Sequence, residues 1–189
     1  MRLRSTEAGW GVLLRTFHWL IAALILAQAV IGLSMVPMGV TPAKVRVFAL
    51  HKSIGMTILA LALLRIAWRM GEKRPADPAG MPRWQRGAAR AVHLTLYFLI
   101  LAIPLSGWWF NSASNAPLAW FGLFPIPSLT GGYDPVWKPR ALLTHQMLFW
   151  VLVALLVAHV GAALWHHFVQ RDDVLRRMLV GSRERNGGG

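Results

Sequence analysis

Four long apolar stretches, separated by polar segments that are rich in proline, dominate the sequence. They cover about residues 17–36, 47–69, 91–110 and 142–168. A helix that spans the hydrocarbon core of a bilayer needs about 20 mostly apolar residues, and each stretch reaches this length. Prolines, which are typical of loops, cluster between the stretches. The pattern predicts an all-α membrane protein that folds as a four-helix transmembrane bundle.

The chain shows no internal repeat, and we expect residues 1–180 to form a single transmembrane domain. Residues 181–189 are polar and rich in glycine, and we expect them to form a disordered tail. A cleaved signal peptide is the alternative for the first stretch, because Ala27-Gln28-Ala29 resembles a cleavage site. The apolar run continues beyond that site to Met35, so we expect the first helix to be retained.

The charged residues are few and unevenly distributed. They make up 14% of the chain, whereas a soluble domain has about 25%. If all four stretches span the membrane, 15 of the 20 Lys and Arg residues fall on the side that holds both termini. Cytoplasmic loops carry an excess of Lys and Arg, so we expect both termini in the cytoplasm. The net charge of +13 therefore gives no reason to expect a nucleic acid partner, whose readers are soluble folds with one basic face.

Cysteine is absent from the sequence. Its absence excludes disulfides, iron–sulfur clusters, cysteine-based zinc sites and covalently attached haem. Any haem in this protein must therefore be held by coordination and packing alone.

All seven histidines fall inside or at the end of an expected span, where ionisable residues are costly and usually functional. They are His18, His51, His93, His145, His159, His166 and His167. With the N-terminus inside, His51 and His145 lie at matched depths near the outer surface, on different helices. His145 and His159 are 14 residues apart, which corresponds to about 21 Å of helical rise and about four turns. We therefore predict two b-type haems held by axial pairs: His51 with His145 outside, and His18 with His159 inside.

Other interpretations of these histidines remain open. His166 shares a helix face with His159 and competes for the inner site, where it would lie about 31 Å from His145 along the helix. Any single transmembrane histidine is more often a hydrogen-bonding partner or part of a proton path. Zinc is a weaker alternative because a structural zinc site needs four ligands together. A haem-free transporter would be the corresponding function.

Several further residues have a place in this hypothesis. Arg65 lies 14 residues after His51 and is a candidate partner of a haem propionate, although snorkelling to anionic lipid is an equal alternative. Gly55 and Gly161 are small enough to allow close approach within a bundle. His93 is expected to be interfacial rather than next to a quinone. An outer basic set either steers a small anion or merely keeps the loops soluble. Its members are Lys44, Arg46, Lys52, Lys138 and Arg140.

Short runs around these histidines resemble the bacterial cytochrome b561 family. They are Phe17-His18-Trp19-Leu20, Leu50-His51-Lys52-Ser53-Ile54-Gly55, Thr144-His145, Ala158-His159-Val160-Gly161-Ala162-Ala163-Leu164-Trp165-His166-His167 and Arg171-Asp172-Asp173-Val174-Leu175-Arg176-Arg177-Met178. The resemblance covers nearly the whole chain, from about His18 to Leu179. It implies a four-helix inner-membrane bundle that carries two b haems on the same four histidines.

The resemblance also suggests an activity. Some members oxidise superoxide on the periplasmic side and pass the electron to ubiquinone near the inner haem, where His166 is the matching candidate here. A loop lysine linked to quinone in those members has no clear counterpart, because Gly80 falls near its position. The Leu-His-Lys-Ser-Ile-Gly run is shared with a second subgroup, whose electron donor is less settled.

We therefore hypothesise a quinone-linked oxidoreductase that moves electrons from a periplasmic donor, with superoxide as one candidate, to the ubiquinone pool. With two histidines on each iron, no coordination position is left for oxygen, and electrons must pass by outer-sphere transfer. The alternative is a non-catalytic relay, in which the chain is the membrane anchor of a periplasmic redox protein. The segment Asn111–Arg140 has no assigned role and either covers the outer haem or docks a partner.

Overall fold

The computed structural model describes residues 3–78 and 80–181, and it is built from four long helices. They are α1 (Val12–Met35), α2 (Pro42–Met70), α3 (Arg83–Ala113) and α4 (Trp137–Trp165). All four are long and apolar enough to cross a membrane, which confirms the predicted fold class. The smaller elements are β1 (Ala119–Trp120), β2 (Phe124–Pro125), a π-helical turn η1 (His166–Gln170) and α5 (Val174–Leu179).

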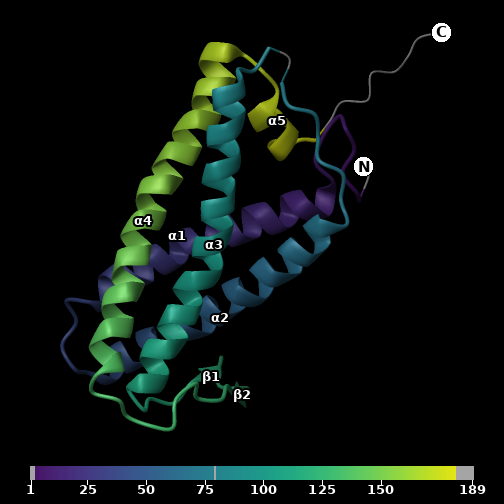
Figure 1. Ribbon diagram of the computed structural model, residues 1–189. Coiled ribbons are helices and arrows are strands. Elements are labelled where there is room, and N and C mark those ends of the chain that lie inside the picture. Colours follow the sequence, from purple (N-terminus) through teal and green to yellow (C-terminus); the bar gives the residue numbers. More distant parts are fainter. Residues whose placement is uncertain (1–2, 79, 182–189) are drawn as a thin grey trace.

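The helices form two antiparallel pairs. α1 packs along α2, α3 packs along α4, and α2 joins the pairs through its contact with α3. Figure 1 shows the two pairs crossing obliquely. They lie close together at the end that carries the β1–β2 hairpin, and they diverge at the end where the N-terminal segment and α5 lie. By the charge distribution, we expect the hairpin end to face outward.

Many apolar side chains of the helices are exposed on the outside of the bundle. Leu26, Val30 and Val157 are 65%, 68% and 70% exposed, as expected for side chains that face lipid. The buried positions include small residues such as Ala62 and Ala113, both at 0% exposure. Small residues of this kind allow transmembrane helices to approach each other closely.

The helices are longer than the apolar stretches predicted. α1 begins at Val12 rather than near residue 17, and α3 extends over Arg83–Ala113 rather than about 91–110. α2 begins at Pro42, where Thr41 caps the first turn by accepting a hydrogen bond from the Lys44 N–H at 3.2 Å. Hydropathy reports the residues that lie in lipid, whereas a helix continues through the interface until a cap ends it. The predicted tail at 181–189 lies, from residue 182 onward, outside the described residues.

Candidate functional site

The outer histidine pair comes together between α2 and α4. The ring centres of His51 and His145 are 6.2 Å apart, and their planes are inclined by 78°. His51 lies on α2 and His145 near the start of α4. The structure therefore joins the two histidines that the sequence placed at matched depths.

The inner pair is formed in the same way from α1 and α4. The ring centres of His18 and His159 are 6.3 Å apart, with an interplanar angle of 66°. α4 therefore supplies one ring to each pair, and α1 and α2 supply the other two.

The separation of the rings fits a metal ion between them. A metal–imidazole bond is about 2 Å long and the ring centre lies roughly 1 Å beyond the bonded nitrogen, so two rings on opposite sides of one metal ion have centres about 6 Å apart. The observed 6.2 and 6.3 Å match this spacing. Each pair offers only two nitrogen ligands, and no group of three or more His, Asp or Glu within the described residues is arranged to hold a metal ion. Two facing imidazoles without a further protein ligand would suit a haem, whose own ring would supply the remaining ligands of the iron.

The His145 ring is oriented by the backbone of α3. Its Nδ1–H donates to the Ile103 carbonyl oxygen at 2.9 Å and lies 3.1 Å from the buried Ser106 Oγ, which donates to the same carbonyl. Pro104 follows Ile103 within α3 and lacks an N–H, which leaves the Ile100 carbonyl, four residues earlier, without its helical donor. A hydrogen bond of this kind leaves Nε2 with its lone pair, and histidines that bind metals usually donate their other N–H in this way.

Two glycines make room for the outer rings. A Cβ at Gly107 on α3 would lie 3.1 Å from His145 Cε1, and a Cβ at Gly32 on α1 would lie 3.2 Å from His51 Cε1. Both distances are tighter than ordinary contacts. Gly55, which the sequence singled out, instead lies beside Gln28, and a Cβ at Gly161 would have open space. The glycines that touch the rings were therefore missed by sequence reasoning.

The inner pair lies in a larger cluster. The guanidinium of Arg65 donates from Nη1 to His18 Nδ1 at 3.1 Å and lies 5.6 Å from the centre of the Tyr97 ring. Arg65 is thus beside the inner site, as its spacing from His51 suggested. His93 was expected to be merely interfacial, but its ring centre lies 5.4 Å from that of His159. α3 therefore contributes a third imidazole to the inner cluster.

His166 does not join this cluster by any contact among the described residues. Its Nδ1 is hydrogen-bonded to the carboxylate of Asp172 instead. The structure thus brings His18 to His159 rather than to His166, and the alternative inner pair is not formed.

The outer loop is fastened to α2 next to His51. Lys52 Nζ donates to the Pro117 carbonyl at 2.6 Å and to Asn111 Oδ1 at 3.1 Å. Trp120 Nε1 donates to Thr57 Oγ1 at 3.0 Å, and the Ser53 hydroxyl accepts from the Phe121 N–H. The β1–β2 hairpin therefore lies against the outer part of α2, as Figure 1 shows.

The outer basic set is not one cluster. Lys52 points inward and holds the loop, whereas three other members lie over aromatic rings. The rings are Phe48 for Lys44, Tyr133 for Lys138 and Trp137 for Arg140.

Comparison with known proteins gives a consistent result. The family model described as prokaryotic cytochrome b561 matches residues 9–181. The chain is 34% identical to cytochrome b561 homolog 2 of Escherichia coli K12 over 180 residues, which cover 95% of both chains. It is 30% identical to cytochrome b562 of Cereibacter sphaeroides over 93% of this chain and 98% of the relative. It is 27% identical to the probable superoxide oxidase CybB of Yersinia pestis over 88% of this chain and 93% of the relative.

Proposed function

The chain belongs to the prokaryotic cytochrome b561 family, and from this premise we propose that it is a dihaem cytochrome that passes electrons from a donor outside the inner membrane to ubiquinone inside. Membership of the family means electron transfer across a membrane by b-type haem. The dihaem state, the direction, the donor and the acceptor are the parts that we propose. Both termini would then lie in the cytoplasm, in agreement with the distribution of Lys and Arg.

The observation that carries the proposal is the pair of ring spacings, 6.2 Å outside and 6.3 Å inside. His51 with His145 and His18 with His159 are the proposed axial ligands. Haem bound between two histidines supplies one-electron transfer and has no open position for oxygen. Because α4 provides one ring of each pair 14 residues apart, the two sites would be stacked about 21 Å apart along one helix.

Residues that contact the histidine rings determine how the rings are oriented and which nitrogen carries the proton. The carbonyl of Ile103 holds the His145 tautomer that leaves Nε2 as the ligand atom. Gly107 and Gly32 let α3 and α1 approach the two outer rings closely.

At the inner site, the contact between Arg65 and His18 fixes which nitrogen of the His18 ring carries the proton. An arginine is always a donor, so His18 Nδ1 is the acceptor, and a neutral ring then carries its proton on Nε2. A haem held through Nε2 of His18 would require the proton on Nδ1, and Arg65 would then be free of the ring and could pair with a propionate.

Replacement of Arg65 by glutamine is expected to lower the midpoint potential of the inner haem and to leave that of the outer haem unchanged. Loss of a positive charge near the iron favours the oxidised form. At an effective dielectric constant of about 20, the fall is on the order of 50–100 mV. A redox titration followed by haem absorbance measures both potentials. The matched control is Arg69→Gln, one turn along α2, where the guanidinium lies over the Trp10 ring. Equal shifts in the two variants would contradict a direct role for Arg65.

The first experiment on the function itself is a reduced-minus-oxidised spectrum of the detergent-purified protein, with a pyridine haemochrome assay. We expect two b haems per chain, both low-spin. A colourless protein from haem-replete cells would overturn the proposal, and one haem per chain would overturn its dihaem part.

The donor is tested separately. One relative carries the name probable superoxide oxidase, and superoxide is therefore the donor that we propose. Addition of superoxide to the purified oxidised protein should reduce the haems, and superoxide dismutase should abolish that reduction. Reduction only by a periplasmic protein fraction would instead favour the relay function, with this chain as the membrane anchor.

A further inference from the structure

The inner end of α4 has an unusual ending. From His166 to Gln170 the helix widens into the π-helical turn η1, and Arg171 then adopts a left-handed conformation with φ of 54°. The Asp172 N–H donates back to the His166 carbonyl at 3.1 Å. A residue other than glycine keeps a left-handed conformation where its surroundings enforce it. A π-helical turn is itself rare in proteins.

This ending brings one carboxylate against one imidazole. Asp172 Oδ2 accepts the hydrogen bond from His166 Nδ1, and Asp172 Oδ1 accepts from the Val174 N–H at 3.0 Å, at the start of α5. The two side chains are 13% and 17% exposed. The neighbouring residues do not share the arrangement. Asp173 pairs with Arg176 at the surface, and the His167 ring lies against Phe168.

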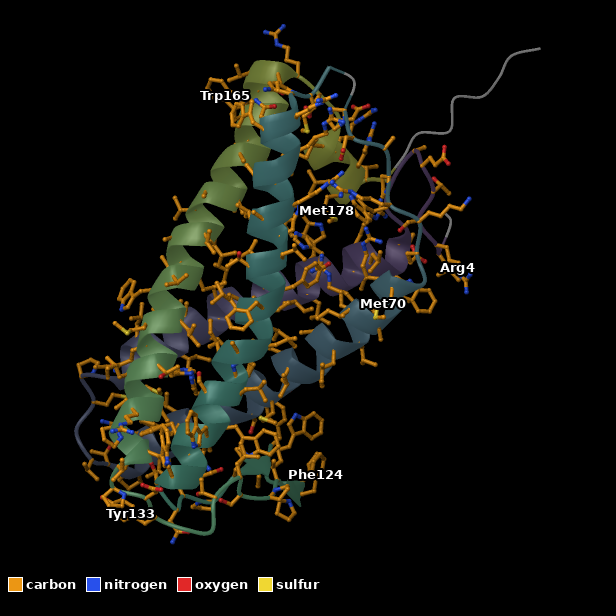
Figure 2. The ribbon with its side chains drawn as sticks, viewed as in Figure 1. Arg4, Met70, Phe124, Tyr133, Trp165 and Met178 are labelled. Atoms are coloured by element: carbon orange, nitrogen blue, oxygen red, sulfur yellow. The ribbon has the colours of Figure 1, made fainter. Side chains whose placement is uncertain are left out.

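The carboxylate is also anchored to the rest of the bundle. α5 is fastened to α1 because Trp19 Nε1 donates to the Met178 carbonyl at 3.1 Å. It is fastened to the α2–α3 connection because Arg177 donates to the Ala76 carbonyl at 2.8 Å. Figure 2 shows Trp165 at the end of α4 and Met178 on α5, which folds back toward α1. Asp172 therefore holds the His166 ring against a docked element rather than against a free tail.

An imidazole held in this way is suited to proton exchange. The carboxylate accepts the Nδ1–H, so the neutral ring keeps the lone pair of Nε2, which can accept a proton and pass it on. Nε2 of His166 makes no hydrogen bond to any described residue, so it is available to an external partner. The same division of roles between carboxylate and imidazole is used in general acid–base catalysis.

We propose that Asp172 is a positioning residue that prepares His166 to deliver protons to the quinone at the inner end of the bundle, an inference that rests on the proposed quinone reduction. The reaction balances as one quinone, two electrons and two protons forming one quinol. The electrons come from the outer donor, one at a time, through the chain. The protons come from cytoplasmic water, and each passes through Nε2 of His166 to a carbonyl oxygen of the quinone.

The test compares Asp172→Asn with the matched control Asp173→Asn in the full-length haem-loaded protein. The amide oxygen of asparagine still accepts the Val174 N–H, so α5 keeps its cap. Its NH₂ group then faces His166 Nδ1 and forces the tautomer with the proton on Nε2, without a negative charge. Nitrogen-15 NMR of histidine-labelled protein, which reads the tautomer without any turnover, should show a change at His166 in Asp172→Asn only.

The kinetic readout is the reoxidation of the prereduced haems by a short-chain ubiquinone in a stopped-flow instrument. A positioned general acid contributes about 10²–10⁴-fold. Asp172→Asn should therefore slow reoxidation at saturating quinone by at least about tenfold, with little change in the quinone concentration needed for half saturation. His166→Gln should slow it further, and Asp173→Asn should match the wild type.

The outcomes separate the two hypotheses. If ubiquinone fails to reoxidise the wild-type haems, the proposed function is wrong and the inference falls with it. If the wild type reacts and Asp172→Asn reacts equally fast with normal haem content, the function stands and the role of Asp172 is overturned. An equal loss of rate in Asp173→Asn would also overturn it, because the effect would then be one of general charge.

Discussion

Alanine at His159 is expected to reduce the haem content of the purified protein from two haems per chain to one, with only the outer haem left. The substitution removes one of two axial ligands and leaves His18 alone. Loss of a residue that merely supports a metal ligand already costs about 10–100-fold in affinity, so loss of the ligand itself should exceed that. His145→Ala should give the complementary result, with only the inner haem left. The pyridine haemochrome assay measures the content, and redox-resolved spectra identify which haem remains.

His93→Ala is the informative control for this prediction. The His93 ring is nearer to His159 than His18 is, with ring centres 5.4 Å apart against 6.3 Å. Only the longer separation fits a metal ion between the rings. His93→Ala should therefore keep both haems, and His18→Ala should lose one. The opposite pattern would show that His93 is the partner of His159 and that the assignment of the inner ligands is wrong.

The four helices were predictable because lipid imposes a simple rule. Every residue that faces hydrocarbon must be apolar, and each span needs enough of them to cross. The helix ends follow a different rule. The Thr41 cap at Pro42 and the π-turn at His166 lie at the interface, where polar residues are tolerated on both sides of a helix end. Hydropathy alone therefore placed the start of α2 and of α4 too late, and it placed the end of α4 beyond Trp165, inside the π-turn.

The histidine pairs were predictable for a related reason. A helix converts sequence separation into depth, so residues such as His51 and His145 can be matched by depth on different helices. Depth does not say which helices are neighbours. The oblique crossing of the two helix pairs (Figure 1) decides that His93 of α3 reaches the His159 ring. No periodicity within α3 carries that information.

Sequence reasoning also failed to identify the glycines that contact the histidine rings. Gly55 and Gly161 were chosen for their closeness in sequence to a histidine, yet the contacts are made by Gly32 and Gly107, which lie on other helices. One signal for Gly107 was present in the sequence. Pro104 interrupts an otherwise continuous span three residues earlier, and a proline within a transmembrane helix marks a place where backbone groups find other partners. The Ile103 carbonyl, directly before Pro104, accepts a hydrogen bond from the His145 ring, although the carbonyl that loses its helical donor to Pro104 is that of Ile100.

Valine at Gly107 is expected to abolish the outer haem while the helix bundle remains intact. A Cβ at this position would lie 3.1 Å from Cε1 and 3.3 Å from Nδ1 of His145, and valine adds two more methyl groups around it. The ring must then move, and it loses the hydrogen bond from Nδ1 to the Ile103 carbonyl that fixes its direction. Gly107→Ala should give a graded effect, with haem bound about 10–100-fold more weakly, as for other losses of support to a metal ligand.

Gly87→Val on the same helix is the matched control, because a Cβ at Gly87 meets nothing within 4 Å. Both substitutions place the same β-branched residue in α3, so any cost of valine to the helix itself is shared. Haem titration into the apoprotein, followed by absorbance, measures occupancy of the two sites separately. We expect one site in Gly107→Val and two in Gly87→Val. Two sites of normal affinity in both variants would mean that the His145 ring tolerates displacement, and that the close contact with α3 is not what directs the ligand toward the iron.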